Sequence, residues 1–189
     1  VSVDWKDVLD DDPPRTDYPM RRKNDTLRYL MDFRFGLRNG AIQLPRGVIQ
    51  GQKLLMLLRR LTLHTWHTRD FDQFPIPFRA VATDIRTRSV VVLSGGDLAQ
   101  AVRASMAIPL VFDPERIEGR DLVDGGLASN VPIATARRAG ATRVIVSDVG
   151  WRPPDSVRTT NPLAIADLLI AYLFSQPLDS LGPEDRIVR

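Results

Sequence analysis

The clearest hydrophobic periodicity lies between Gly47 and Thr65, where leucines recur at three- and four-residue spacing. The leucines of this stretch are Leu54, Leu55, Leu57, Leu58 and Leu61. Their spacing gathers them on one face of an α-helix, while Lys53, Arg59 and Arg60 fall elsewhere on the helical wheel. The pattern predicts an amphipathic helix over 47–65 whose apolar face is more typical of core packing than of a binding surface.

Two β-rich runs follow, Phe78–Ile85 and Val90–Leu93, and the short polar link Arg86–Ser89 predicts that they form a hairpin. A second helix is predicted over Leu98–Met106, because Asp97 stands before it as an N-cap residue. Weaker patterns predict a helix over 25–33 and an apolar helix over 163–174.

A buried strand, a turn, a helix and a second strand are predicted in succession after Gly119. The strand Leu122–Val123 ends at Asp124, the helix follows Pro132, and the second strand covers Val144–Ser147. This order is typical of a βαβ unit, so we expect the two strands to be parallel neighbours in an α/β fold with three layers. Functional groups in such folds gather at the carboxyl ends of the strands.

Asp124 is the main candidate for chemistry, because it lies at a strand end and is followed by Gly125 and Gly126. The glycines would supply unusual backbone angles and clear space beside the carboxylate. An Asp-Gly-Gly sequence is also a common structural turn, and that alternative stays open. Asp84 and Asp148 end strand-like runs as well and could line the same edge, but neither is followed by paired glycines.

Composition narrows the classes of function. The 189 residues are 43% hydrophobic, which suits one globular domain with a sizeable core. The net charge is only +3, and the 23 arginines and 3 lysines are scattered along the chain without an aromatic-interleaved basic patch. We therefore expect no nucleic-acid binding.

Metal and membrane-spanning roles have little support in the sequence. The chain has no cysteine, and His64 and His67 lack an acidic partner at ligand spacing, so we predict no zinc site and no metal cofactor. A run of about 18 apolar residues is also missing, so no membrane span is predicted.

Several blocks, taken together, resemble the second half of a bacterial patatin-like phospholipase. They are Arg103-Ala-Ser-Met-Ala-Ile-Pro109, Val111-Phe112 and Leu122-Val-Asp-Gly-Gly-Leu127 with Asn130 and Pro132, preceded by Ile76–Asp84 and by Leu44–Gly51. The resemblance covers residues 1–150, and it leaves 151–189 as a linker and an apolar helix that packs on the domain or on a partner. It implies a three-layer αβα sandwich with a mostly parallel central sheet, and it places a glycine near Arg88 that this chain lacks.

The resemblance also implies an activity. Members of the family hydrolyse acyl esters with a serine–aspartate dyad, and the matching aspartate is Asp124. The family's serine lies in a Gly-x-Ser-x-Gly elbow, which does not occur in these 189 residues. The resemblance thus implies the aspartate-bearing part of a lipid acyl hydrolase, with the N-terminal, serine-bearing part of the domain missing, and the isolated chain is expected to be inactive.

Other expectations accompany this reading. The substrate would be a phospholipid or another acyl ester, with no cofactor, and Leu54, Leu57, Leu58 and Leu61 could form the wall of an acyl pocket or a lipid-facing surface. Peripheral membrane contact, a homodimer, and a location in the bacterial cytoplasm or the cell envelope, including its outer membrane, are all left open. Two alternatives are a non-catalytic patatin-like protein that binds lipid or a partner, and a generic α/β binding domain.

Overall fold

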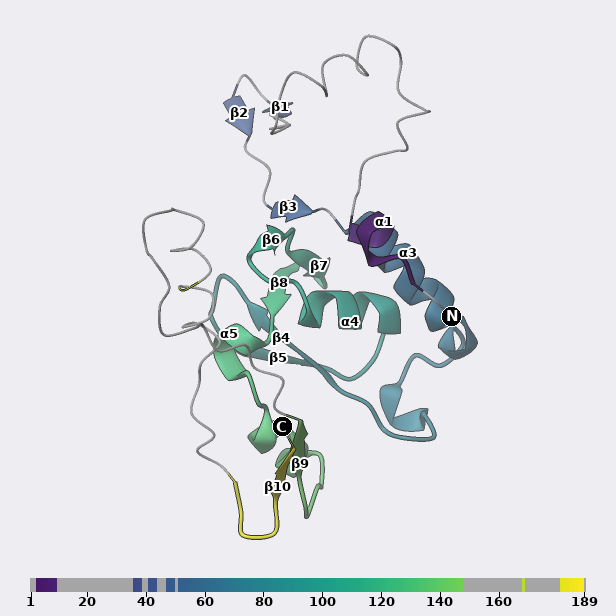
Figure 1. The fold of residues 1–189 in the computed structure, drawn as a ribbon, viewed down its shortest axis with the longest axis vertical. Coiled ribbons are helices and arrows are strands. Elements are labelled where there is room, and N and C mark those ends of the chain that lie inside the picture. Colours follow the sequence, from purple (N-terminus) through teal and green to yellow (C-terminus); the bar gives the residue numbers. More distant parts are fainter. Residues whose placement is uncertain are drawn as a thin grey trace.

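The computed structural model describes residues 3–9, 36–38, 41–43, 47–49, 51–147, 168 and 181–188 (Figure 1). The predicted helices over 25–33 and 163–174, and Asp148, lie outside the described residues apart from Leu168, which is helical. Three short elements come first in the chain: α1 (Trp5–Leu9), which packs against the helix at Gln52–Leu61, and the antiparallel pair β1 (Gly36–Arg38) and β2 (Ala41–Gln43).

A four-stranded sheet with the order β5-β4-β8-β7 forms the centre of the described chain. Every pair of neighbours in it is antiparallel. Its strands are β4 (Ala80–Asp84), β5 (Val90–Leu93), β7 (Glu115–Ile117) and β8 (Arg120–Asp124). All five residues of β4 are buried, which agrees with its inner position in the sheet.

The strand directions correct the expected parallel sheet. Short turns join β4 to β5 and β7 to β8, whereas a parallel pair needs a crossover of about a dozen residues or more. The β7–β8 turn consists of Glu118 and Gly119, with φ values of 50° and 78°. Two consecutive residues with positive φ match the type I′ turn of tight hairpins.

The predicted partner of β8 is wrong as well. Both edges of β8 are occupied, by β4 and by β7, so no edge remains for the segment after Pro132. That segment forms α6 (Ile133–Arg138) and then β9 (Ile145–Ser147), which pairs in parallel with β10 (Arg186–Val188). The fold is α/β, as predicted, but the expected βαβ unit between β8 and β9 does not form.

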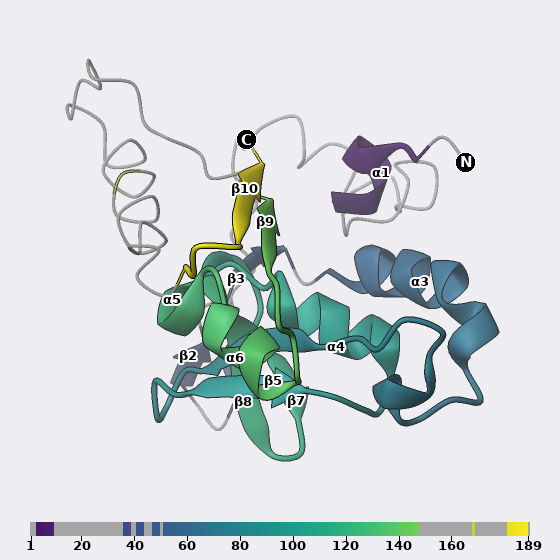
Figure 2. The same ribbon diagram turned by 90° about the horizontal axis from the view of Figure 1, so that it is seen from below.

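Helix α4 (Leu98–Ser105) packs against β4 and β8, and α3 (Gln52–Leu61) packs on α4, as Figure 2 shows. Asp97 accepts hydrogen bonds from the backbone N–H groups of Ala99 and Gln100, which confirms it as the cap of α4.

The predicted helix over 47–65 begins later than expected. Gly47–Ile49 is strand β3, which pairs in parallel with β6 (Leu110–Phe112). Gly51, directly before α3, has a φ of 76°. Because this left-handed conformation does not fit a helix, α3 begins only at the next residue. Two short 3₁₀ helices follow, η2 (Leu63–Thr65) and η3 (Phe71–Gln73).

Small apolar side chains fill the space between α4 and the sheet. Ala82, Val91, Ala104 and Leu122 form one buried cluster there. Leu54 of α3 forms another with Ala107 and Phe112, which fixes α3 to the segment after α4. Leu122 of β8 belongs to the first cluster and Val123 beside it is fully buried, so the C-terminal half of β8 is more deeply buried than its start.

Candidate active site

The position of Asp124 is fixed by the strand that precedes it. Leu122 and Val123 are 1% and 0% exposed and anchor β8 in the core. The backbone N–H of Asp124 donates a hydrogen bond of 2.9 Å to the carbonyl of Ala107 in the segment after α4. The end of β8 is therefore fixed both by the sheet and by the neighbouring loop.

The carboxylate of Asp124 is half-buried at this strand end. Its Oδ1 accepts a hydrogen bond of 2.8 Å from the backbone N–H of Gly126, and Oδ2 accepts none from the part of the chain that the structure describes. Burial raises the pKa of Asp124 above its ordinary value, and the Gly126 N–H opposes part of that rise. A half-buried carboxylate with one oxygen held and a raised pKa is suited to accept a proton.

Gly125 meets a need for space and not for an unusual angle. Its φ is −62°, which any residue can adopt, so the predicted need for special backbone angles does not apply at this position. A Cβ atom on Gly125 would lie only 2.3 Å from the carbonyl oxygen of Val81 in β4. At Gly125 the group that comes close is the backbone of β4, and the prediction that both glycines clear space beside the carboxylate stays a prediction.

Thr83 holds the turn from the neighbouring strand. It is 3% exposed, and its hydroxyl donates to the backbone carbonyl of Asp124 at 2.9 Å. The same oxygen accepts from the N–H of Ala128 at 3.2 Å, in the short helix α5 (Gly126–Ser129). One side chain therefore links the strand end to the helix after it.

Sequence reasoning did not single out Thr83. The signal that could have found it is a hydroxyl directly after the apolar run Ala80–Ala82 of a predicted buried strand, because a buried hydroxyl normally has a hydrogen-bond partner. Ser105 on α4 shows the same behaviour, since its hydroxyl donates to the carbonyl of Val81 at 2.7 Å.

Asp84 lies away from the candidate site, contrary to the expectation that it lines the same edge. Because β4 and β8 are antiparallel, Asp84 is opposite Leu122, whereas Asp124 is opposite Ala82. The carboxylate of Asp84 accepts hydrogen bonds from the N–H groups of Arg86 and Thr87 and so closes the β4–β5 turn. The pKa of Asp84 is lowered, mainly by the hydrogen bond from the Arg86 N–H, so the turn itself accounts for the shift.

The leucines of α3 differ in their surroundings. Leu54 is buried, Leu57 and Leu58 are half-buried, and Leu61 is 50% exposed. Leu58 packs against the cluster that contains Leu54 and Phe112, which is ordinary core packing. A role for these four leucines in an acyl pocket stays a prediction.

Metal ligands do not gather in the described part of the chain. No group of three or more His, Asp or Glu side chains there could hold a metal ion, and His64 and His67 are exposed. None of the helices in the described ranges has both the length and the apolar character needed to cross a bilayer.

Comparison with known proteins gives a family for this arrangement. The model of the patatin-like phospholipase family matches residues 4–137, a range that contains β4, α4, β8 and the Asp124 turn. The chain belongs to the patatin-like phospholipase family. This confirms the resemblance inferred from the sequence blocks.

Individual relatives within the patatin-like phospholipase family come from bacteria and mammals. An uncharacterized NTE family protein of Mycobacterium tuberculosis is 32% identical over 123 residues, which are 65% of this chain and 33% of that protein. Patatin-like phospholipase domain-containing protein 7 of Mus musculus is 38% identical over 97 residues, 49% of this chain and 7% of that protein. Patatin-like phospholipase domain-containing protein 6 of Homo sapiens is 40% identical over 95 residues, 48% of this chain and 7% of that protein. The chain thus matches about a third of the mycobacterial relative and a small part of the mammalian ones.

Proposed function

We propose that the protein is a lipid acyl hydrolase in which Asp124 is the general base of a serine–aspartate dyad. The family match supports a lipid hydrolase role. The observation that carries the assignment to Asp124 is its half-buried carboxylate, with Oδ1 held by Gly126 and a raised pKa. The proposed substrate is a phospholipid or another acyl ester.

The proposed chemistry has two stages. A serine hydroxyl attacks the acyl carbonyl carbon while its proton passes to Asp124, and the protonated Asp124 then gives that proton to the departing alcohol. In the second stage Asp124 takes a proton from water, which attacks the acyl-enzyme, and the proton returns to the serine oxygen as the fatty acid leaves. A raised pKa suits both directions of this transfer.

The nucleophilic serine is proposed to lie outside these 189 residues. No Gly-x-Ser-x-Gly elbow occurs in the 189 residues, and the relatives extend well beyond the matched segment. Ser105, the serine of the α4 segment, donates its hydroxyl to Val81 and so serves the packing of α4 on β4. The proposal therefore places the serine in sequence beyond these residues, and the 189-residue chain alone should hydrolyse nothing.

The test is an Asp124→Asn substitution in the full-length protein, assayed with p-nitrophenyl esters and with phospholipid. The amide cannot accept the serine proton, so kcat/KM should fall by about two orders of magnitude or more, with the fold kept. Asp121→Asn is the matched control, because it makes the same chemical change on the same strand at a side chain that pairs with Arg86. The control should retain the activity.

A fluorophosphonate probe tests the location of the serine. It should label the full-length protein and leave the isolated 189-residue chain unlabelled. Full activity of Asp124→Asn, or labelling of the isolated chain, would contradict the proposal. Lipid binding by the full-length protein with neither hydrolysis nor labelling would favour the non-catalytic alternative.

A further inference from the structure

The segment between Gly51 and Arg69 has a one-sided charge. It contains Lys53, Arg59, Arg60 and Arg69, together with two histidines, and no Asp or Glu. The whole chain has 26 basic and 23 acidic residues, so this imbalance is local. A local excess of cations on an exposed surface favours an anionic partner.

The same segment exposes large apolar side chains where α3 ends and η2 begins. Leu61, Leu63 and Trp66 are 50%, 66% and 56% exposed. Single exposed apolar residues are ordinary, but here three occur within six positions and arginines flank them on both sides. We call residues 59–69 the α3–η2 tip.

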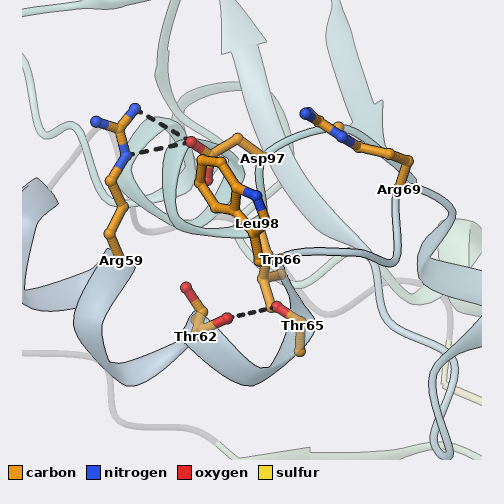
Figure 3. Close-up of a pocket in the computed structure, with 8 residues that line it drawn as sticks. Arg59, Thr62, Thr65, Trp66, Arg69, Asp97 and Leu98 are labelled. Carbon is orange, nitrogen blue, oxygen red and sulfur yellow. Dashed lines mark hydrogen bonds and ion pairs between the residues drawn. The ribbon is translucent and has the colours of Figure 1, made fainter.

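Figure 3 shows the Trp66 ring between the side chains of Arg59 and Arg69, in a small surface pocket that Thr62, Thr65 and Leu98 also line. The Arg69 guanidinium lies 6.0 Å from the centre of the Trp66 ring. Arg59 is engaged with Asp97 at 3.1 Å, so it is the cation of the tip that is already neutralised.

Two other arginines of the tip remain for a partner. Arg60 and Arg69 form no ion pair with any acidic side chain in the ranges that the structure describes. The acidic residue next in sequence, Asp70, accepts the backbone N–H of Asp72 at the start of η3. The tip therefore combines exposed cations with an exposed aromatic ring and two exposed leucines.

We propose that the α3–η2 tip docks on the surface of an anionic phospholipid bilayer. Leu61, Leu63 and Trp66 enter the headgroup region, where an indole ring buries its apolar face and keeps its N–H near water. Arg60 and Arg69 meet lipid phosphates, which a guanidinium binds with two donors. Docking would depend on the charge and exposure of the tip and not on Asp124.

Vesicle co-sedimentation of the full-length protein tests the proposal. Binding should be strong on equimolar phosphatidylcholine and phosphatidylglycerol, weak on phosphatidylcholine alone, and reduced by salt. Replacing Arg60 and Arg69 by Gln should weaken the partition onto the anionic vesicles by about tenfold or more, since each contributes roughly fivefold near such a surface. Trp66→Ala with Leu63→Ala should weaken it by about tenfold through lost apolar contact.

Matched controls separate the tip from general charge and hydrophobicity. Arg116→Gln with Arg120→Gln removes two exposed arginines from the sheet, and Ile145→Ala removes an exposed apolar side chain of β9, which Figure 1 draws away from α3. These controls should bind as the unchanged protein does. Equal losses in the tip variants and the controls, or no loss in the tip variants, would overturn the proposal.

Tryptophan fluorescence gives a second readout. With Trp5, Trp151 and any tryptophan outside these 189 residues replaced by Phe, emission comes from Trp66 alone and should shift to the blue when anionic vesicles are added. Emission that is already blue without vesicles and does not change would mean that another part of the protein covers the tip, which also overturns the proposal.

Hydrolysis of a soluble short-chain ester by the tip variants separates this inference from the proposed catalytic role. It should be unchanged in every tip variant, whereas Asp124→Asn should abolish it and leave vesicle binding intact. The two proposals can therefore fail independently of each other.

Discussion

The two ends of β8 both carry a turn with glycine, and the glycines serve opposite purposes. At the start of the strand, Gly119 has a φ of 78° and nothing lies within 4 Å of where a Cβ would be. At the end, Gly125 has a φ of −62° and the carbonyl oxygen of Val81 lies 2.3 Å from that position. The first turn needs glycine for its angle, and the second needs it for space.

The difference indicates where chemistry can be built. The Glu118–Gly119 turn is exposed to solvent and reverses the chain between β7 and β8. At the Asp124 turn the backbones of two strands come close, and the Thr83 hydroxyl links the turn to α5. A crowded, hydrogen-bonded turn holds a carboxylate in one place, which an acid–base group requires.

The largest expected effect is on stability at the crowded end. Gly125→Ala places a methyl group against the β4 backbone, so the sheet or the turn must shift, and the free energy of unfolding should fall by about 3 kcal/mol or more. Gly119→Ala meets no atom and should cost only about 1–2 kcal/mol, from its left-handed φ. Urea unfolding of both variants measures the difference.

The order of these two costs is the decisive result. If Gly119→Ala were the more destabilising change, backbone angle would matter more than space at both ends, and the contrast between the turns would be wrong. A third variant, Ala128→Gly in α5, serves as a control for the effect of exchanging Ala and Gly close to the same turn.

Local patterns predicted several individual elements of the fold. The β4–β5 hairpin, the Asp97 cap and the buried end of β8 follow from short-range spacing and from the chemistry of a few side chains. Strand direction did not follow, because a buried apolar strand looks the same in a parallel and an antiparallel sheet. The useful signal was Glu118-Gly119, a two-residue link with glycine between short β runs, which is a mark of a tight hairpin.

The candidate site was only partly readable from the sequence. Asp124 stood out because it ends an apolar run and precedes two glycines. Thr83 is 41 residues away in sequence, and only the pairing of β4 with β8 brings its hydroxyl to the Asp124 carbonyl. The glycine that the family resemblance places near Arg88 also has a physical meaning, because Arg88 adopts a φ of 58° at that turn.

The next prediction concerns the hydroxyl that distinguishes the crowded end. Thr83→Val keeps the shape of the side chain but leaves the Ala128 N–H without its acceptor, which should cost about 1–3 kcal/mol of stability. Thr83→Ser retains the hydroxyl and should lose less. If the turn positions Asp124, Thr83→Val should also lower kcat for ester hydrolysis more than it raises KM.

A pH profile shows whether Thr83 acts through Asp124. Activity should fall at low pH as the raised pKa of Asp124 is crossed and the base becomes protonated. Thr83→Val should move this acidic limb because it loosens the environment of the carboxylate, and Thr83→Ser should restore it. A stability loss with an unmoved limb and an unchanged kcat would show that Thr83 only supports the fold.

The smallest expected effect lies at the open end of β8. Glu118 has a φ of 50°, a conformation that asparagine tolerates better than glutamate does, so Glu118→Asn should relieve strain on the order of 1 kcal/mol. The change also removes an ion pair of 3.2 Å with Arg120, but both side chains are largely exposed and such pairs contribute only about 0–1 kcal/mol. We therefore expect a net gain in stability of a few tenths of a kcal/mol, and a larger gain when Arg120→Gln has already removed the pair. Arg116→Asn on β7 should destabilise instead, because asparagine is unfavourable in a strand. A loss of stability from Glu118→Asn in the Arg120→Gln background would show that the positive φ at Glu118 does not strain this turn.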